Sequence, residues 1–222
     1  MRQGLAAKVF GALGRVLIAT VDFFTPLIDD ARTWGSIAAA NAASDVYAMG
    51  GRPLFALNIV AWPQGRLPLD LLGEVLAGGE QTAADGGWLV VGGHTVDGPE
   101  PLYGQAVIGE ATEAELLTNT GGRDGQALVL TKALGTGIVA TAVKRLDQAA
   151  TQPGGRLAPS YRAAVAGMTM LNADAAAATS SSRGFRVRVR PSWRSRSPRR
   201  PVSSAMTPLA SMPAASMWPW SR

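Results

Sequence analysis

One segment of small residues, followed directly by helix-ending residues, constrains the fold of this chain most. Residues 34–49 are rich in Ala, Asn and Ser, and Gly50, Gly51 and Pro53 follow them. We expect a helix over 34–49 with Thr33 as its N-cap, because glycine favours termination and proline cannot continue a helix. Small side chains allow this helix to pack closely and leave room beside its backbone for a ligand.

The neighbouring segments predict alternating strands and helices. Residues 16–24, 54–62 and 102–111 are β-branched, aromatic and aliphatic, which is typical of buried strands. Residues 69–84 predict a helix that begins after a proline and ends at a glycine pair. Residues 88–101 predict a short strand that runs into a turn-rich loop. This alternation favours a mixed α/β or α+β layered fold.

The second half of the chain predicts a separate unit. Residues 126–146 predict a strand, a glycine-rich turn and a helix, and residues 159–178 predict one Ala-rich helix. The polar stretch over 112–124 is the expected domain boundary. The predicted domains are residues 1–116, 117–178 and 179–222.

The charge of the chain is divided between a body and a tail. From Arg183 onward there are nine Arg and no acid, so residues 1–182 hold 12 of the 21 bases and all 16 acids, a net charge of −4. The tail over 179–222 is interpreted as a disordered basic arm for nucleic acid or an acidic membrane surface, or as translation out of frame. A mildly acidic body is not a nucleic-acid footprint.

Two absences limit the classes of protein. The chain has no cysteine, which excludes disulfides, thiolate metal sites and a cysteine nucleophile. No uninterrupted apolar run reaches the roughly 18 residues of a membrane span. Lys8 and Arg15 interrupt the apolar N-terminal segment, which favours a soluble, cytoplasmic chain over a secreted one.

Two acids are candidates for a phosphate and cation site. Asp22 lies at the end of a predicted strand, and Asp45 lies near the end of the helix of small residues, which needs no carboxylate to fold. Carboxylate oxygens suit Mg²⁺, which takes one or two of them together with phosphate oxygens and water. The alternatives are a turn cap for Asp22 and an exposed helix position for Asp45.

Two glycine-rich segments are further candidates. Gly92 and Gly93 follow a predicted strand and would let backbone N–H groups approach an anion, with His94, the single histidine, beside them. The alternative is a turn with a solvated imidazole. The glycines after Lys132 fit neither a phosphate loop nor a dinucleotide fingerprint, so we interpret residues 134–137 as a tight turn.

Four stretches together resemble one enzyme family. They are ATVDFFTPLIDD, IAAANAASDVYAMGGRPLFALNIVAWP, VVGGHTVDGPEPLYGQAVIGEA and LTKALGTGIVATA. Their order and spacing are similar to selenophosphate synthetase (selenide, water dikinase), over about 16–178. The resemblance implies an α+β, PurM-like (AIR synthetase-like) two-domain fold, in which two N-terminal domains form a homodimer with a β-barrel. It implies the conversion of ATP, selenide and water to selenophosphate, AMP and phosphate, with Mg²⁺ as the metal.

The resemblance also implies roles for particular residues. Asp45 would be a ligand of Mg²⁺ and ATP, and Asp22 would lie in the ATP site beside the phosphates. Gly92, Gly93 and His94 would form an ATP-contacting loop that reaches across the dimer interface. Since ATP is itself strongly negative, acids facing it need cations between them and the phosphates.

The chain departs from the family pattern in three places. The Gly-rich segment with its Cys or selenocysteine and catalytic Lys is not found, so no catalytic residue is assigned. The place comparable to an acidic pair reads LAAKV over 5–9, and the Asp-Val-Thr-Gly-Phe-Gly segment of the second domain is replaced by the basic tail. We therefore expect an incomplete second domain and impaired activity. The alternatives are another ATP-dependent kinase or synthetase of the superfamily, and an inactive paralogue that dimerises or binds nucleic acid.

Overall fold

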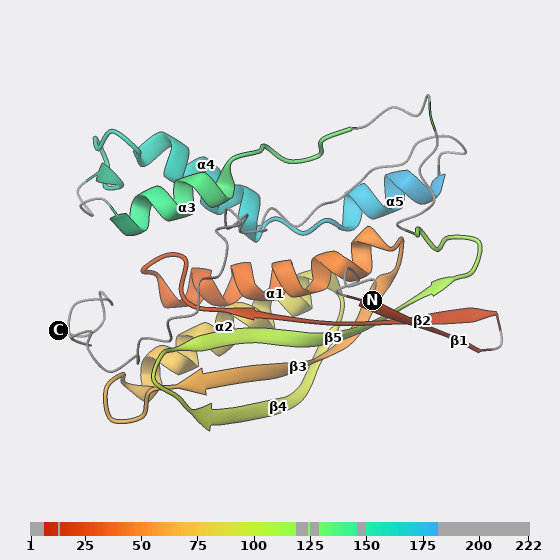
Figure 1. Cartoon of the computed structure of the whole chain (residues 1–222), viewed down its shortest axis with the longest axis horizontal. Coiled ribbons are helices and arrows are strands. Elements are labelled where there is room, and N and C mark those ends of the chain that lie inside the picture. The colour runs from red at the N-terminus through yellow and green to blue at the C-terminus, as the bar shows by residue number, and fades with distance from the viewer. Residues whose placement is uncertain (1–6, 13, 119–123, 125–128, 146–149, 182–222) are drawn as a thin grey trace, which may run out of the picture.

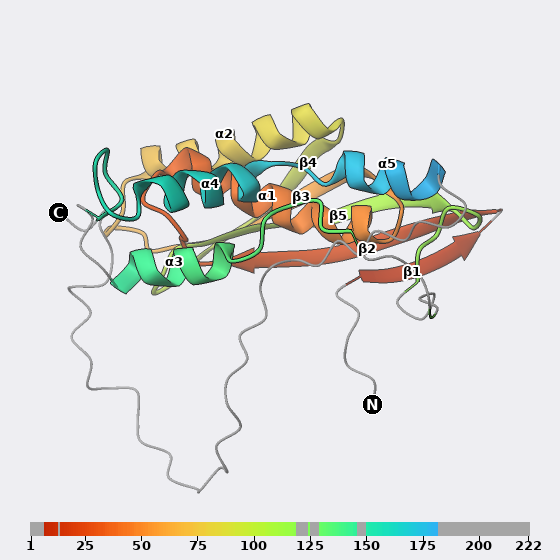
Figure 2. The ribbon, with the colours of Figure 1, turned by 90° about the horizontal axis from the view of Figure 1, so that it is seen from above.

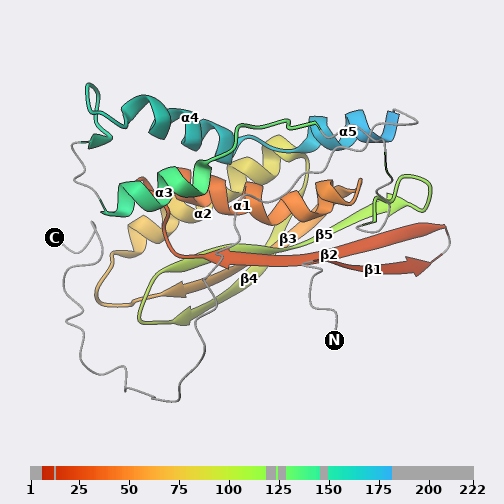
Figure 3. The same ribbon diagram turned by 45° about the horizontal axis from the view of Figure 1, so that its top comes forward.

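A twisted five-stranded sheet forms the base of the structure, a computed structural model that describes residues 7–12, 14–118, 124, 129–145 and 150–181 (Figure 1). Two long helices cover one face of the sheet, and three shorter helices lie above them (Figures 1 and 3). The strands are β1 (Ala7–Ala12), β2 (Arg15–Phe24), β3 (Arg52–Trp62), β4 (Leu89–Asp97) and β5 (Leu102–Thr112). The helices are α1 (Ala31–Ala48), α2 (Leu69–Gly86), α3 (Thr136–Arg145), α4 (Ala158–Thr169) and α5 (Ala173–Ser181).

The strand order is β1-β2-β5-β3-β4. Every neighbouring pair is antiparallel except β3 and β4, which are parallel and are joined through α2. A parallel pair needs such a crossover, and α2 uses it to cover the same sheet face as α1. The mixed sheet with helices on one face confirms the predicted α+β class.

Helix α1 is enclosed on several sides, which explains its small residues. Its inner side contacts β2 and β5, α2 lies beside it, and α4 and α5 lie along its outer side (Figure 2). Ala38, Ala39, Ala42 and Ala43 are fully buried. A helix enclosed in this way has little room for large side chains, so the composition of residues 34–49 follows from its position.

The ends of α1 show one wrong prediction and one confirmed one. Asp30, not Thr33, is the N-cap, and its carboxylate accepts a hydrogen bond from the Thr33 backbone N–H at 2.8 Å. Asp competes well for this position because its short side chain reaches the free N–H groups of the first turn. At the other end, Gly50 has φ +74 and ends the helix as expected.

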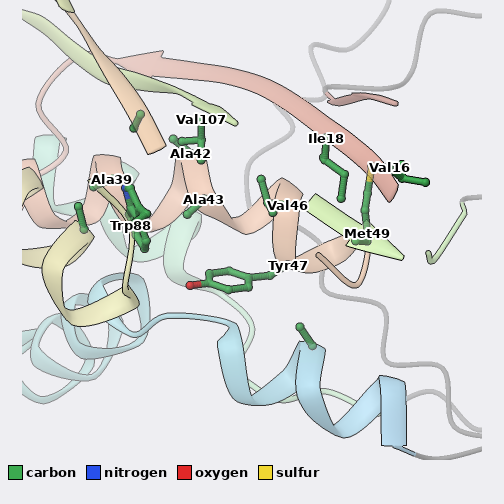
Figure 4. Close-up of a cluster of buried hydrophobic side chains, with 14 residues drawn as sticks. Val16, Ile18, Ala39, Ala42, Ala43, Val46, Tyr47, Met49, Trp88 and Val107 are labelled. Atoms are coloured by element: carbon green, nitrogen blue, oxygen red, sulfur yellow. The ribbon is translucent and has the colours of Figure 1, made fainter. Parts of the chain in front are cut away.

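The core lies between the sheet and α1, in two clusters of buried side chains. One cluster surrounds the second half of α1, where Tyr47 lies between α1 and α5 and Trp88 packs from the start of β4 (Figure 4). The other surrounds the first half, where Trp34 and Tyr103 meet edge to face with ring centroids 6.2 Å apart. The two clusters fix α1 over the centre of the sheet.

The opposite face of the sheet is open and apolar. The residues that point to it from β2 and β3 are large, exposed hydrophobics: Leu17, Val21, Phe23, Phe55 and Leu57. We call these five residues the open apolar face. Contiguous exposed apolar surface of this kind marks interaction sites on soluble proteins.

Other elements differ from the sequence predictions. Strand β1 was not expected, and it forms a tight hairpin with β2 that pairs Ala12 with Arg15. The predicted strand at the start of 126–146 is absent from the described residues 129–135, although the helix that follows is confirmed as α3. The single helix predicted over 159–178 is two helices, α4 and α5.

The predicted tail lies almost wholly outside the described residues. Residues 179–181 belong to α5, so the last helix extends beyond the predicted start of the tail, and residues 182–222 are not described. Among the helices of the described part of the chain, none is both long and apolar enough to cross a bilayer.

Candidate functional site

Strand β2 and helix α1 bring Asp22 and Asp45 to the same place. Thr20 and Asp22 are two residues apart on β2, so both side chains point to the sheet face that α1 covers. Asn41 and Asp45 are one turn apart on α1, so both lie on one side of the helix. Two side chains on one face of β2 therefore face two side chains on one side of α1.

Two hydrogen bonds cross between the strand and the helix. The Thr20 hydroxyl donates to Asp45 Oδ2 at 2.8 Å, and Asn41 Nδ2 donates to Asp22 Oδ2 at 2.6 Å. Each carboxylate is thus held by a neutral donor from the opposite element. We call these four residues the acid pair and its donors.

The two carboxylates lie in an environment that disfavours negative charge. Burial raises the pKa of Asp45, and the hydrogen bond from Thr20 partly opposes that change. Burial also raises the pKa of Asp22, the bond from Asn41 lowers it, and the charge of Asp45 raises it again. The two acids are close enough to repel each other, and no cationic side chain contributes to either shift.

This donor set suits a hard cation shared with another ligand. The described residues hold no group of three or more His, Cys, Asp or Glu that would enclose a metal by themselves. Mg²⁺ commonly takes only one or two protein carboxylates and completes its octahedron with phosphate oxygens and water. Asp22 and Asp45 match that requirement, and a cation between them would relieve their repulsion.

The structure does not bring Gly92, Gly93 and His94 to the acid pair of the same chain. All three lie within β4, not in the loop expected from the sequence. His94 is exposed and pairs with Ile59 of β3, which places it on the open apolar face side, away from α1. Close approach of β3 explains Gly93, since a Cβ there would lie 2.3 Å from the Asn58 carbonyl oxygen.

Sequence reasoning missed two members of this site. Thr20 and Asn41 were not singled out, although each has a spacing from a candidate acid that indicates a shared face: two residues on the strand, four on the helix. The signal was present, but it identifies a partner only when the strand and the helix are known to face each other.

Lys132 has a structural position. The turn predicted over 134–137 is only partly as expected, because residues 134–135 precede α3 while Thr136 and Gly137 are the first residues of that helix. The ammonium group of Lys132 donates to the backbone oxygen of Met170, the C-cap residue of α4. Burial lowers the pKa of this lysine. A cation at a helix C-terminus is favourable, so Lys132 stabilises the end of α4.

The part of the chain that holds this site is similar to proteins of known family. Residues 6–111 match the family model described as "AIR synthase related protein, N-terminal domain". A selenide, water dikinase of Myxococcus xanthus is 52% identical over 134 residues, which is 60% of this chain and 38% of that protein. One from Porphyromonas gingivalis is 49% identical over 156 residues, 70% of this chain and 42% of that protein. The chain thus spans about two fifths of the length of these relatives.

Solved structures show the same fold at low sequence identity. Thiamine monophosphate kinase from Aquifex aeolicus superposes with a TM-score of 0.60 and 18% identity, over 80% of this chain and 60% of that one. Hydrogenase maturation protein HypE in complex with ATP superposes with a TM-score of 0.53 and 21% identity, over 66% of this chain and 45% of that one. The fold is that of a PurM-like N-terminal domain.

The residues that carry the site lie in the part of the chain with the family match. Asp22 and Asp45 both fall within residues 6–111. The chain is a homologue of the selenide, water dikinases, similar to them over 60% to 70% of its own length.

Proposed function

We propose that this chain carries the nucleotide-binding and Mg²⁺-binding part of a selenide, water dikinase. The observation that carries the proposal is the facing pair Asp22 and Asp45, held by donors from two elements in a domain that is about half identical to those enzymes. The family reaction would convert ATP, selenide and water to selenophosphate, AMP and phosphate.

The two acids have separate roles in this proposal. Asp45 holds Mg²⁺ and orients the nucleotide through it, and Asp22 lies beside the phosphates. Bound Mg²⁺ would supply positive charge that neutralises the phosphate oxygens during transfer. The half-buried, pre-arranged carboxylates need little reorganisation to receive the metal, and such preorganisation is the main protein contribution in phosphoryl transfer.

No residue of this chain is proposed as a nucleophile or as the catalytic lysine. The described residues supply binding and positioning, so we expect the chain by itself to bind Mg²⁺ and ATP with little turnover. The proposed boundary between the nucleotide-binding domain and a partial second domain lies near residue 116. The proposed location of the protein is the cytoplasm.

A second copy of the chain is the proposed occupant of the open apolar face. Two such faces would pack into the β-barrel of a homodimer and remove large exposed side chains from water. The same arrangement would bring the β4 segment that holds Gly92, Gly93 and His94 toward the partner's nucleotide, because His94, like its partner Ile59 on β3, lies on the sheet face turned away from its own acid pair. The register of β4 supports this division of the site.

Calorimetric titration of the whole chain with Mg²⁺ and a non-hydrolysable ATP analogue tests the proposal. We expect the unmodified chain to bind the analogue in a Mg²⁺-dependent way, and Asp45→Asn to lose most of that dependence. Glu113→Gln removes one negative charge from an exposed position and should leave binding unchanged. Equal binding with and without Mg²⁺, or equal binding by Asp45→Asn, would contradict the proposed site.

A second candidate function rests on the charge of the tail. Nine Arg without one acid follow residue 182, and this composition favours contact with phosphate backbones. In this alternative the chain is an inactive paralogue that dimerises and binds nucleic acid. Binding of an oligonucleotide that weakens steeply with salt, and that is lost when residues 182–222 are deleted, would support this function.

A further inference from the structure

We propose that Thr20 is a positioning residue for the metal site, and that its hydroxyl holds the Asp45 carboxylate in the orientation that receives the cation. The inference rests on the proposed function, because it assigns how one of the proposed metal ligands is fixed. It concerns a residue that neither the sequence motifs nor the family comparison assign.

The geometry of Thr20 suits it to fix another side chain. Its side chain is buried, with 5% of its surface exposed, and its hydroxyl reaches Asp45 Oδ2 at 2.8 Å. A β-branched side chain in a strand has few accessible χ1 rotamers, so the hydroxyl direction is set by the backbone of β2. The bond leaves the second carboxylate oxygen of Asp45 available to a cation.

Helix α1 gives Asp45 no electrostatic support of its own. Asp45 is in the last turn of α1, and its carbonyl oxygen accepts from the Met49 backbone N–H. A carboxylate near a helix C-terminus meets the negative end of the helix dipole, which is unfavourable. The orientation of Asp45 must therefore come from outside the helix, and within the described residues Thr20 is the side chain that donates to it.

The hydroxyl next to Asp45 in the sequence, that of Ser44, is already engaged. Ser44 donates to the Ala40 carbonyl oxygen at 2.7 Å and accepts from Asn172 Nδ2 at 2.8 Å. Asn41 donates to Asp22 instead. Loss of the Thr20 hydroxyl would therefore leave Asp45 with the freedom to rotate and without a ready replacement donor.

Removal of such an outer hydrogen bond weakens metal binding without removing a ligand. Partners that orient a metal ligand typically contribute roughly 10- to 100-fold to metal affinity. We expect Thr20→Val, which keeps the branched shape and removes the hydroxyl, to weaken divalent cation binding by about 10-fold. Thr20→Ser, which keeps the hydroxyl, should restore most of that affinity.

Electron paramagnetic resonance titration of the full chain with Mn²⁺, in the presence of a non-hydrolysable ATP analogue, measures this affinity directly. Thr82→Val is the matched control, since Thr82 is also buried and donates its hydroxyl to a backbone oxygen, Gly78 O, on α2 away from the site. It should bind Mn²⁺ like the unmodified chain. Thermal unfolding without metal checks that each variant is folded.

The outcomes separate this inference from the proposed function. Mn²⁺ binding by Thr20→Val equal to that of the unmodified chain would overturn the role of Thr20 alone, as would Thr20→Ser binding as weakly as Thr20→Val. If the unmodified chain binds no Mn²⁺, the proposed function itself fails. If Thr20→Val does not fold, Thr20→Ala replaces it against the same Thr20→Ser comparison. Added to Asp45→Asn, the valine should cause no further loss, because Thr20 acts through Asp45.

Discussion

At the scale of single residues, the acid pair places two carboxylates where the protein environment disfavours their charged form. Asp22 and Asp45 are both held in surroundings that raise their pKa values, and each is near the other's charge. Carboxyl groups with a raised pKa destabilise the metal-free fold at neutral pH. The reason is that such a group loses its proton more readily in the unfolded chain than in the folded one, so deprotonation favours unfolding. A cation bound between the two carboxylates, as proposed, would reverse this effect.

Asp45→Asn should therefore raise the melting temperature of the metal-free chain at pH 7. Since the folded-state pKa is raised, the stability of the unmodified chain falls as the pH rises from the unfolded value near 3.8 through the raised value. The advantage of the variant should shrink as the pH is lowered toward 3.8, whereas Glu113→Gln should show no such trend. Melting curves that gave Asp45→Asn no advantage at pH 7 would contradict this view of the site.

At the scale of elements, the crossing of α1 over α2 depends on two glycines. A Cβ on Gly35 would lie 1.9 Å from the Val75 carbonyl oxygen, and one on Gly78 would lie 1.9 Å from the Arg32 carbonyl oxygen. Both clashes are with backbone, which cannot rotate away. The helices must therefore move apart if either glycine gains a side chain.

Gly78→Ala should lower the free energy of unfolding by about 1–3 kcal/mol or more, as overpacking does in a close-packed core. Gly73→Ala, in the same helix, meets no atom within 4 Å and should instead stabilise by about 0.5–1 kcal/mol, because alanine favours a helix over glycine. Denaturant unfolding measures both. Equal effects at the two positions would show that the backbones of α1 and α2 do not approach each other closely at Gly78.

At the scale of the whole molecule, the open apolar face is the proposed dimer interface. Val21, on β2, is 50% exposed on this face, in the row that continues through Ala106 of β5 to Leu57 of β3. A lysine there would place a charge in the middle of a dry interface, which costs far more than a charge at a rim. The proposed dimer should not tolerate it.

Val21→Lys should reduce the mass in solution from twice the 23.0 kDa chain mass to the chain mass. Leu69→Lys is the matched control, since Leu69 is an exposed leucine, 67% accessible, on α2 at the other side of the sheet. Light scattering after gel filtration gives both masses. A Val21→Lys variant that remained dimeric would place the interface elsewhere.

Local sequence signals were enough for most of the elements around the site. The small-residue helix, the strands that flank it and the helix ended by Gly87 follow from hydrophobic pattern and glycine chemistry, and all are present. Predictions failed where tertiary contacts decide. Strand β1 forms because β2 offers it a pairing edge, and the N-cap is Asp30 because its carboxylate reaches the Thr33 N–H.

The sequence by itself determined a layered fold of strands and helices and identified Asp22 and Asp45 as candidate site residues, because strand and helix periods and a carboxylate in an otherwise apolar helix are local features. Only the tertiary structure decided that Thr20 meets Asp45 and Asn41 meets Asp22, since these pairs are 25 and 19 residues apart. It also decided that His94 lies on the face away from the acids, because a strand's register fixes which side of the sheet each residue occupies. Contacts between distant segments depend on how β2, α1 and β4 are stacked, and no local pattern encodes that stacking.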